Sequence, residues 1–183
     1  MAIVNNKHKF IYMHPQKCAG GTLSNILQRA FPDTNLKTNN PHPTFSSMAL
    51  LAKLPLEQYF KFAVTRNTWD RVVSMYFHVK KHQNYTYNFD RFVFNFLNPS
   101  FSMHQKLTYQ NKYIIDYVIR FDHLAEDVKI VMNRLDVYNY KLEHVTHNTG
   151  RPTADYRSYY NEQTKNHVYN IFKWEIDTFN YEF

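Results

Sequence analysis

Short apolar runs alternate along this chain with longer segments whose apolar residues recur at helical spacing. Such runs are typical of buried strands, and strands that alternate with helices form a parallel sheet covered by helices. The sequence therefore predicts an α/β fold with a central parallel sheet flanked by helices. The predicted strands are residues 10–13, 59–64 and 117–121, and the predicted helices are residues 22–31, 45–54, 68–80, 89–97, 125–135 (with Asp122 as its cap) and 162–179.

Length and composition limit the number of domains. The chain has 183 residues, which suffices for one sizeable core and favours a single domain over residues 1–183. Hydrophobic residues make up 44% and charged residues 20%, which is the balance of a globular protein.

Cysteine usage and hydropathy bear on the compartment. Cys18 is the only cysteine, so no intrachain disulfide can form and a reducing compartment is compatible. Residues 1–9 are polar and lack the apolar stretch of a signal peptide, and no apolar run has the length of a membrane span. We therefore expect a cytoplasmic protein without a membrane span.

The charge balance predicts anionic partners without choosing among them. The formal net charge is +7, yet Lys and Arg form no block longer than the pair Lys80 and Lys81. This distribution favours a local anion pocket over a broad face for nucleic acid, so we expect no nucleic-acid partner.

The loop between the first predicted strand and helix holds Gly20 and Gly21, two of only 3 glycines. Glycine permits positive φ and close approach of the backbone to a ligand, and a helix N-terminus attracts anions. Lys17 adds a cation and Thr22 a hydroxyl, so this P-loop-like strand–loop–helix unit predicts an oxyanion cradle. An ordinary turn with a surface lysine is the alternative. A Walker motif is excluded because its lysine follows the glycines, whereas Lys17 precedes them.

A second candidate site follows the second predicted strand. Arg66 ends that strand and Ser74 lies two turns into the next helix, so a guanidinium and a hydroxyl could grip one phosphate from two sides. Asp70 and Arg71 are interpreted as a local pair that fixes the start of this helix, with a structural role for Arg71.

Four segments in the same order resemble motifs of the sulfotransferases that use 3′-phosphoadenosine 5′-phosphosulfate (PAPS), in particular the glycan-type branch. Residues 10–27 resemble the 5′-phosphosulfate loop, an apolar strand followed by P-K-x-G/A-G-T-S/T, and residues 62–76 resemble the 3′-phosphate motif V-x-R-[DN]-P-x-[DE]-R-x-x-S-x-Y. Residues 118–127 resemble a later strand-and-helix segment, and residues 159–183 resemble the tail of the glycan-type branch.

Three positions depart from these patterns. Gln16 separates Pro15 from Lys17, Gly21 stands where Thr or Ser is common, and Thr68 replaces the usual Pro. None of these changes removes a charged group. The chain is also short for the family, so we expect the insertions that bind the acceptor to be missing.

The resemblance implies transfer of a sulfuryl group from PAPS to an acceptor hydroxyl, for which a carbohydrate is favoured, with release of adenosine 3′,5′-bisphosphate. It implies that Lys17 is catalytic at the phosphosulfate, that Arg66 and Ser74 hold the 3′-phosphate, and that no metal ion is needed. Arg151 resembles part of a loop that closes over the nucleotide, although a solvent-facing arginine is an alternative. The predicted cofactor-binding residues are Lys17, Cys18, Ala19, Gly20, Gly21, Thr22, Leu23, Arg66, Ser74 and Arg151.

His42 is favoured as the catalytic base. In the glycan-type branch a catalytic histidine lies a little over twenty residues before the 3′-phosphate arginine, and His42 precedes Arg66 by twenty-four. A histidine in a surface loop is the alternative, and His14 and His78 are the next candidates.

Two other classes of function stay open. A kinase-like phosphotransferase would need Mg²⁺ and a Walker-type or acidic metal site, and neither is evident in the sequence. A non-catalytic protein that binds nucleic acid or a sulfated glycan through its net charge of +7 would show steep salt dependence and no need for Lys17. His78 and His82 are four residues apart, but spacing supplies no third metal ligand.

Overall fold

The computed structural model describes residues 2–33, 44, 54–142, 151–153 and 155–183. The chain divides into two compact units, which we call the sheet unit (residues 1–65 and 103–145) and the helical unit (residues 66–102 and 146–183). Each unit is described by itself, and the single domain stays a prediction. The helix predicted at residues 45–54 lies, apart from residue 54, outside the described residues.

The sheet unit is built on a four-stranded sheet with the order β1-β2-β3-β6. Strands β2, β3 and β6 run parallel, with Met13 opposite Ala63 and Val64 opposite Ile119. The predicted α/β fold with a mostly parallel central sheet is thus confirmed. The strands are β1 (Ile3–Asn5), β2 (Phe10–Met13), β3 (Phe60–Thr65) and β6 (Tyr117–Arg120).

Strand β1 was not predicted from the sequence. It pairs antiparallel with β2, with Val4 opposite Ile11, and its residues are buried. Its apolar run is too short to stand out beside the polar residues that follow.

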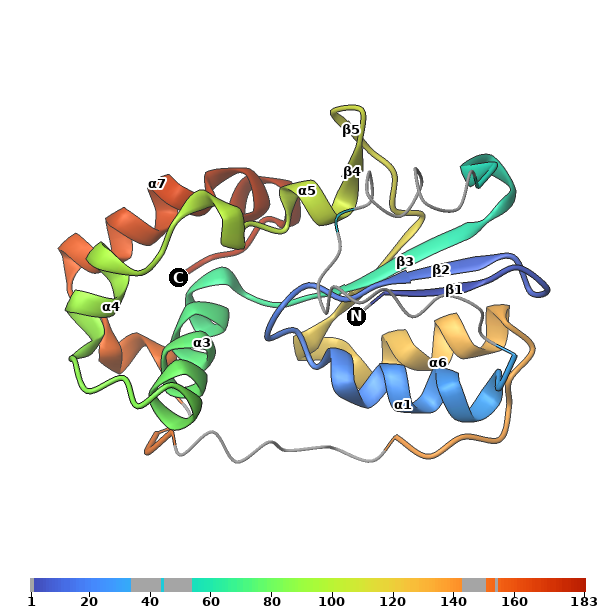
Figure 1. The fold of residues 1–183 in the computed structure, drawn as a ribbon, viewed down its shortest axis with the longest axis horizontal. Helices are drawn as coiled ribbons and strands as arrows, with labels where there is room; N and C mark the ends of the chain where they lie inside the picture. The colour runs from blue at the N-terminus through green and yellow to red at the C-terminus, as the bar shows by residue number, and fades with distance from the viewer. Residues whose placement is uncertain (1, 34–43, 45–53, 143–150, 154) are drawn as a thin grey trace. The chain divides into compact units, whose positions relative to one another are not determined.

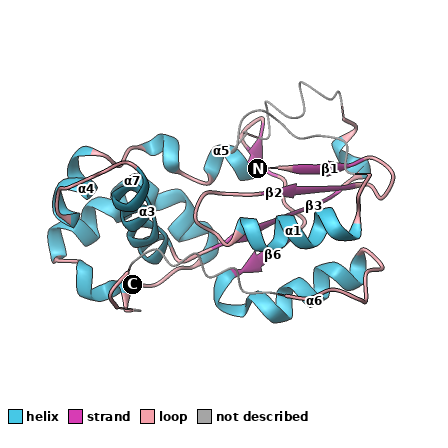
Figure 2. Ribbon diagram, turned by 60° about the horizontal axis from the view of Figure 1, so that its bottom comes forward, coloured by secondary structure: helices cyan, strands magenta, loops and turns pink. Residues whose placement is uncertain are grey.

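Two helices, α1 (Gly20–Ala30) and α6 (Leu124–Arg134), lie side by side on one face of the sheet (Figures 1 and 2). Their buried residues recur three or four positions apart, as expected for an amphipathic helix on a sheet. Within the sheet, the rings of Tyr12 and Phe62 stack with centroids 5.4 Å apart. The buried apolar side chains on these helices are Leu23, Ile26, Leu27, Leu124, Val128, Val131 and Met132.

The start of each of these helices differs from the prediction. Helix α1 begins at Gly20, two residues earlier than expected, with Ala19 as its N-cap. The predicted cap of α6 is wrong, because His123 is the N-cap and Asp122 lies inside the 3₁₀ turn η3 (Phe121–His123). There the Asp122 carboxylate is 3.5 Å from Nε of Arg120.

The remaining elements of the sheet unit are short. A hairpin of β4 (Thr108–Tyr109) and β5 (Lys112–Tyr113) turns at Gln110 and Asn111, whose φ angles of 49° and 61° suit a two-residue hairpin loop. Helix α5 (His104–Leu107) precedes this hairpin, and the 3₁₀ turn η1 (Leu56–Gln58) precedes β3.

The helical unit packs three helices, α3 (Thr68–His82), α4 (Phe89–Asn95) and α7 (Glu162–Phe179), with two 3₁₀ turns, η2 (Pro99–Phe101) and η4 (Tyr156–Tyr159). The predicted helices at residues 68–80, 89–97 and 162–179 are confirmed within two residues at each end. Side-chain caps explain two of the starts: Asn67 accepts the N–H of Trp69 at 3.1 Å, and Asn161 forms a capping box with Thr164.

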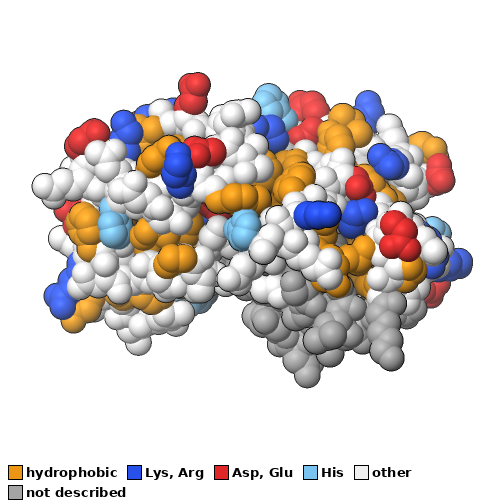
Figure 3. All heavy atoms as spheres, turned by 90° about the horizontal axis from the view of Figure 1, so that it is seen from above, with side chains coloured by type: hydrophobic (Ala, Val, Ile, Leu, Met, Phe, Trp, Pro, Cys, Tyr) orange, Lys and Arg blue, Asp and Glu red, His pale blue; other side chains and the backbone are white. Residues whose placement is uncertain are grey.

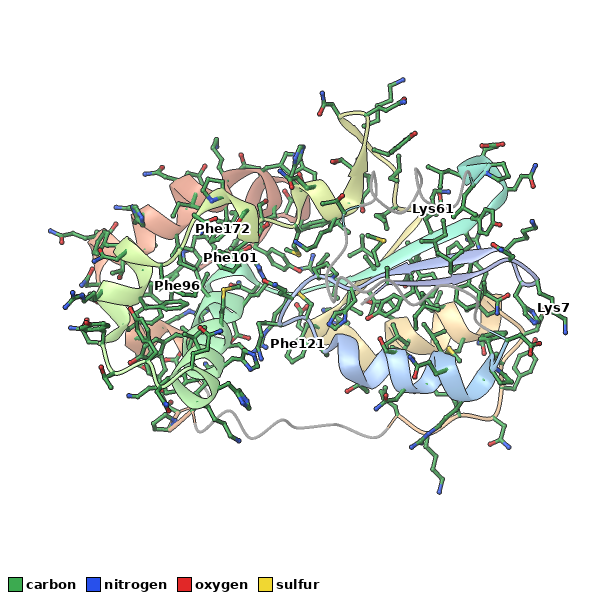
Figure 4. All side chains as sticks on the ribbon, viewed as in Figure 1. Lys7, Lys61, Phe96, Phe101, Phe121 and Phe172 are labelled. Atoms are coloured by element: carbon green, nitrogen blue, oxygen red, sulfur yellow. The ribbon has the colours of Figure 1, made fainter. Side chains whose placement is uncertain are left out.

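The interior of this unit encloses a charged pair. The Arg71 guanidinium and the Glu175 carboxylate are fully buried and bonded to each other. Arg71 also donates to the carbonyl oxygen of Phe101 at 3.1 Å and lies 5.1 Å from the ring centre of Phe172. Phe101 and Phe172 both lie within the helical unit (Figure 4). The structural role predicted for Arg71 therefore holds, but the predicted partner Asp70 is wrong.

Candidate functional site

The loop after β2 has an unusual backbone. Lys17 and Ala19 have φ angles of 63° and 52°, in the left-handed region that residues with a side chain rarely adopt. Gly20 and Gly21 belong to α1 and are helical. The expectation that the glycines supply positive φ is therefore wrong, and Lys17 and Ala19 carry that strain instead. Residues held in this way occur often at ligand-binding sites.

Gly20 is required for a different reason, which is the close approach of His14. An ideal Cβ on Gly20 would lie 1.6 Å from Cδ2 and 1.7 Å from Nε2 of His14, so the imidazole takes the space of a side chain. The Cα–Cβ direction in a helix tilts toward its N-terminus, which places the imidazole beside the first turn of α1. Sequence analysis considered His14 only as an alternative catalytic base and did not predict this packing. The one indication in the sequence was a glycine at position 20 in a chain with few glycines.

The first turn of α1 has the electrostatics of an anion site. It contains no acidic residue and its N-cap makes no side-chain hydrogen bond, so no carboxylate within this turn neutralises the positive end of the helix dipole. Ala19 is left-handed and Gly20 helical, a pair of backbone conformations typical of anion-binding concavities built from successive N–H groups. The backbone here can therefore bind an oxyanion.

Burial decides which atoms of the loop can reach a ligand. The side chains of Cys18, Thr22 and Leu23 are buried, and the Cys18 thiol lies 3.5 Å from the carbonyl oxygen of Gln16. Lys17 is half-buried. Cys18 and Leu23 can therefore contribute backbone atoms only, and the hydroxyl role of Thr22 stays a prediction.

Two arginines that were predicted to bind the cofactor, Arg66 and Arg151, share one carboxylate. Nε of Arg66 donates to Oδ2 of Asp70 at 2.7 Å, and an Nη of Arg151 donates to Oδ1 of the same residue at 2.6 Å. The three side chains are 13%, 12% and 17% exposed for Arg66, Arg151 and Asp70. Sequence reasoning paired Asp70 with Arg71 and missed this bridge, although Arg66 and Asp70 have the four-residue spacing of helical ion pairs.

Ser74 lies on the same face of α3 as Asp70. Residues four apart on a helix are neighbours, so Ser74 lies next to Asp70, and Arg66, which precedes the helix, is bonded to Asp70. Ser74 is 5% exposed. This arrangement is compatible with a grip on one phosphate by Arg66 and Ser74.

Two tyrosines border the Asp70 carboxylate. Burial is the main reason that the pKa of Tyr160 lies well above its usual value, and Asp70 raises it further. Burial also raises the pKa of Tyr156, with a smaller contribution from Asp70. Both hydroxyls are protonated at neutral pH, and that of Tyr160 donates to the carbonyl oxygen of Trp69 at 2.9 Å.

The predicted base and part of the predicted nucleotide loop cannot be placed. His42 and residues 148–150 lie outside the described residues. Among the described residues no three His, Cys, Asp or Glu side chains come together as a metal site, and none of the helices in that part of the chain could cross a bilayer.

On the face seen in Figure 3, Lys and Arg side chains are interspersed with acidic ones rather than gathered in one patch.

Comparison with known proteins decides the family. A family model described as the sulfotransferase family matches residues 1–182. The chain belongs to the sulfotransferase family. Membership assigns this sulfotransferase to the transferases, and its chemistry in general terms to sulfuryl transfer between a small-molecule donor and an acceptor. No curated protein and no solved structure matches the chain.

Proposed function

We propose that this chain transfers the sulfuryl group of PAPS to a hydroxyl of a carbohydrate acceptor. The observation that carries the proposal is the family match, which spans residues 1–182. The donor is inferred from the resemblance of two loops to the 5′-phosphosulfate and 3′-phosphate motifs, and the acceptor from the glycan-type tail.

Lys17 and the first turn of α1 fit the phosphosulfate end of the donor. In the reaction the acceptor oxygen bonds to sulfur while the bond between sulfur and the bridging phosphate oxygen breaks, so negative charge grows on the leaving phosphate. Backbone N–H groups and an ammonium that are oriented beforehand stabilise such charge without reorganisation. Lys17 and the N–H groups from Cys18 to Gly21 take this role, since the N–H of Thr22 already donates to the carbonyl oxygen of Ala19 at 3.1 Å.

Arg66, Ser74 and Arg151 fit the 3′-phosphate. Two guanidinium groups facing one carboxylate leave a net positive charge, and arginine matches phosphate oxygens with paired N–H groups. Holding this phosphate fixes the register of the nucleotide.

His42 is the base in this proposal. It removes the proton of the acceptor hydroxyl as the oxygen attacks sulfur, and adenosine 3′,5′-bisphosphate then leaves. An imidazole with a pKa near 6.5 suits this task at neutral pH.

Ligand-dependent stability tests the proposal. Adenosine 3′,5′-bisphosphate should raise Tm more than ATP at equal concentration, because its two phosphates match the two proposed anion sites. A ligand at about 100 times its Kd stabilises the native state by roughly 2.7 kcal/mol. The effect should persist in EDTA, because no metal ion is proposed. Labelled PAPS with a panel of glycans then tests transfer. An equal Tm shift with ATP that needs Mg²⁺ would support a phosphotransferase, and a glycan-induced shift without any nucleotide effect would support a non-catalytic binder.

A further inference from the structure

We propose that Asp70 is a positioning residue of the 3′-phosphate site, which holds Arg66 and Arg151 in the orientation that binds phosphate. The inference rests on the proposed function and extends it. Each arginine donates one N–H to a different oxygen of Asp70, at 2.7 Å and 2.6 Å. These lengths are typical of charge-assisted hydrogen bonds, which fix direction as well as distance.

The bridge joins parts of the chain that sequence separates. Asp70 and Arg151 are 81 residues apart, and Arg66 precedes α3 and lies four residues before Asp70. All three side chains are less than a fifth exposed, so solvent screens their interactions less than those of a surface ion pair. A flexible arginine loses rotamer freedom on binding phosphate, and a carboxylate that already orders it reduces that loss.

Asp70 is itself held in place. Its backbone N–H lies 3.4 Å from the Asn67 side-chain oxygen in the first turn of α3, and Nδ2 of Asn67 donates to the carbonyl oxygen of Glu182 at 2.7 Å. A carboxylate in the first turn of a helix is also stabilised by the helix dipole. The backbone of Asp70 is therefore anchored at the start of α3.

Two effects of the carboxylate oppose each other. Its negative charge repels a phosphate, whereas its oxygens orient two cations toward it. A guanidinium is planar and carries five N–H groups, and the hydrogen bond of each arginine to Asp70 fixes the direction in which that plane lies. Orientation outweighs repulsion, because without the carboxylate the two positively charged guanidinium groups would repel each other and lose their shared orientation.

The test uses Asp70→Asn, which keeps the shape and removes the charge and one acceptor. Calorimetry measures affinity for two ligands, adenosine 3′,5′-bisphosphate and adenosine 5′-monophosphate, the second of which lacks the 3′-phosphate. We expect Asp70→Asn to weaken the bisphosphate by about tenfold or more and to leave the monophosphate nearly unchanged. Asp70→Glu should recover part of the loss.

Two controls separate positioning from general structure. Asp177→Asn removes a carboxylate from an exposed i,i+4 ion pair with Lys173 in the same unit and should change neither affinity. In an Arg66→Ala/Arg151→Ala background, Asp70→Asn should cause no further loss, because a positioning residue acts only through its partners.

The outcomes are distinct. Tighter binding of the bisphosphate by Asp70→Asn, equal loss for both ligands, or unchanged affinity for both overturns the positioning role while the proposed function stands. If the wild-type chain binds the bisphosphate no better than the monophosphate, the 3′-phosphate site of the proposed function fails and the role of Asp70 falls with it.

Discussion

The imidazole of His14 occupies the space that a side chain on Gly20 would need, since an ideal Cβ there would lie 1.6 Å from Cδ2 of the histidine. The first residue after β2 thus packs against the first residue of α1. This contact fixes both ends of the segment that carries Lys17.

Gly20→Ala should destabilise the protein by about 1–3 kcal/mol, because the added methyl group overpacks the contact with His14. In a His14→Ala background the same change should be neutral or stabilising by up to about 1 kcal/mol, as expected for Gly→Ala in a helix. Urea unfolding of the four proteins measures the coupling. If the two changes are additive, the contact does not determine the need for glycine.

Lys17→Ala should weaken binding of adenosine 3′,5′-bisphosphate and reduce turnover, because Lys17 is proposed to contact the phosphosulfate. His42→Ala should leave the affinity for this nucleotide nearly intact and reduce turnover by about 10²–10⁴. Calorimetry and initial rates on both variants test this split. Normal turnover of His42→Ala would show that another residue is the base, and His14 and His78 would be tested next. Loss of nucleotide binding by His42→Ala would instead assign His42 to the nucleotide pocket.

Glu175→Ala should destabilise the protein by about 3–5 kcal/mol, because it leaves the buried Arg71 guanidinium without its carboxylate. The carboxylate also accepts hydrogen bonds from the hydroxyls of Thr68 and Ser102. The matched control is Asp177→Ala on the same helix, where the ion pair with Lys173 is exposed and should contribute little to stability. Similar losses for both variants in urea unfolding would contradict the distinction.

Tyr12→Phe should stabilise the protein by about 1 kcal/mol at pH 7, because the fully buried hydroxyl of Tyr12 has no hydrogen-bond partner among the described residues. Burial also raises the pKa of Tyr12 far above its ordinary value of 10. Above pH 10 the unfolded chain releases this proton and the folded chain does not, so wild-type stability falls there. The advantage of Tyr12→Phe should therefore grow between pH 9 and about pH 11. A constant difference in Tm across this range would show that Tyr12 does not titrate on unfolding.

The sequence by itself was enough for the order of most elements. Strands β2, β3 and β6 and helices α3 and α7 were predictable because a run of buried residues has the period of its own secondary structure. Strand β1 was not, because three residues carry too little pattern. The cap of α6 also failed, since Asp122 has the right residue type but lies one residue before the actual N-cap.

The candidate site divides in the same way. Local chemistry pointed to Lys17, Arg66 and Ser74, since each belongs to a strand–loop–helix segment whose character is evident within about fifteen residues. Which charged groups meet was decided by the tertiary structure: Asp70 bridges Arg66 and Arg151, and Arg71 pairs with Glu175. The physical reason is that helical and strand periods depend on neighbours along the chain, whereas ion pairs over 81 or 104 residues depend on packing that no local pattern records.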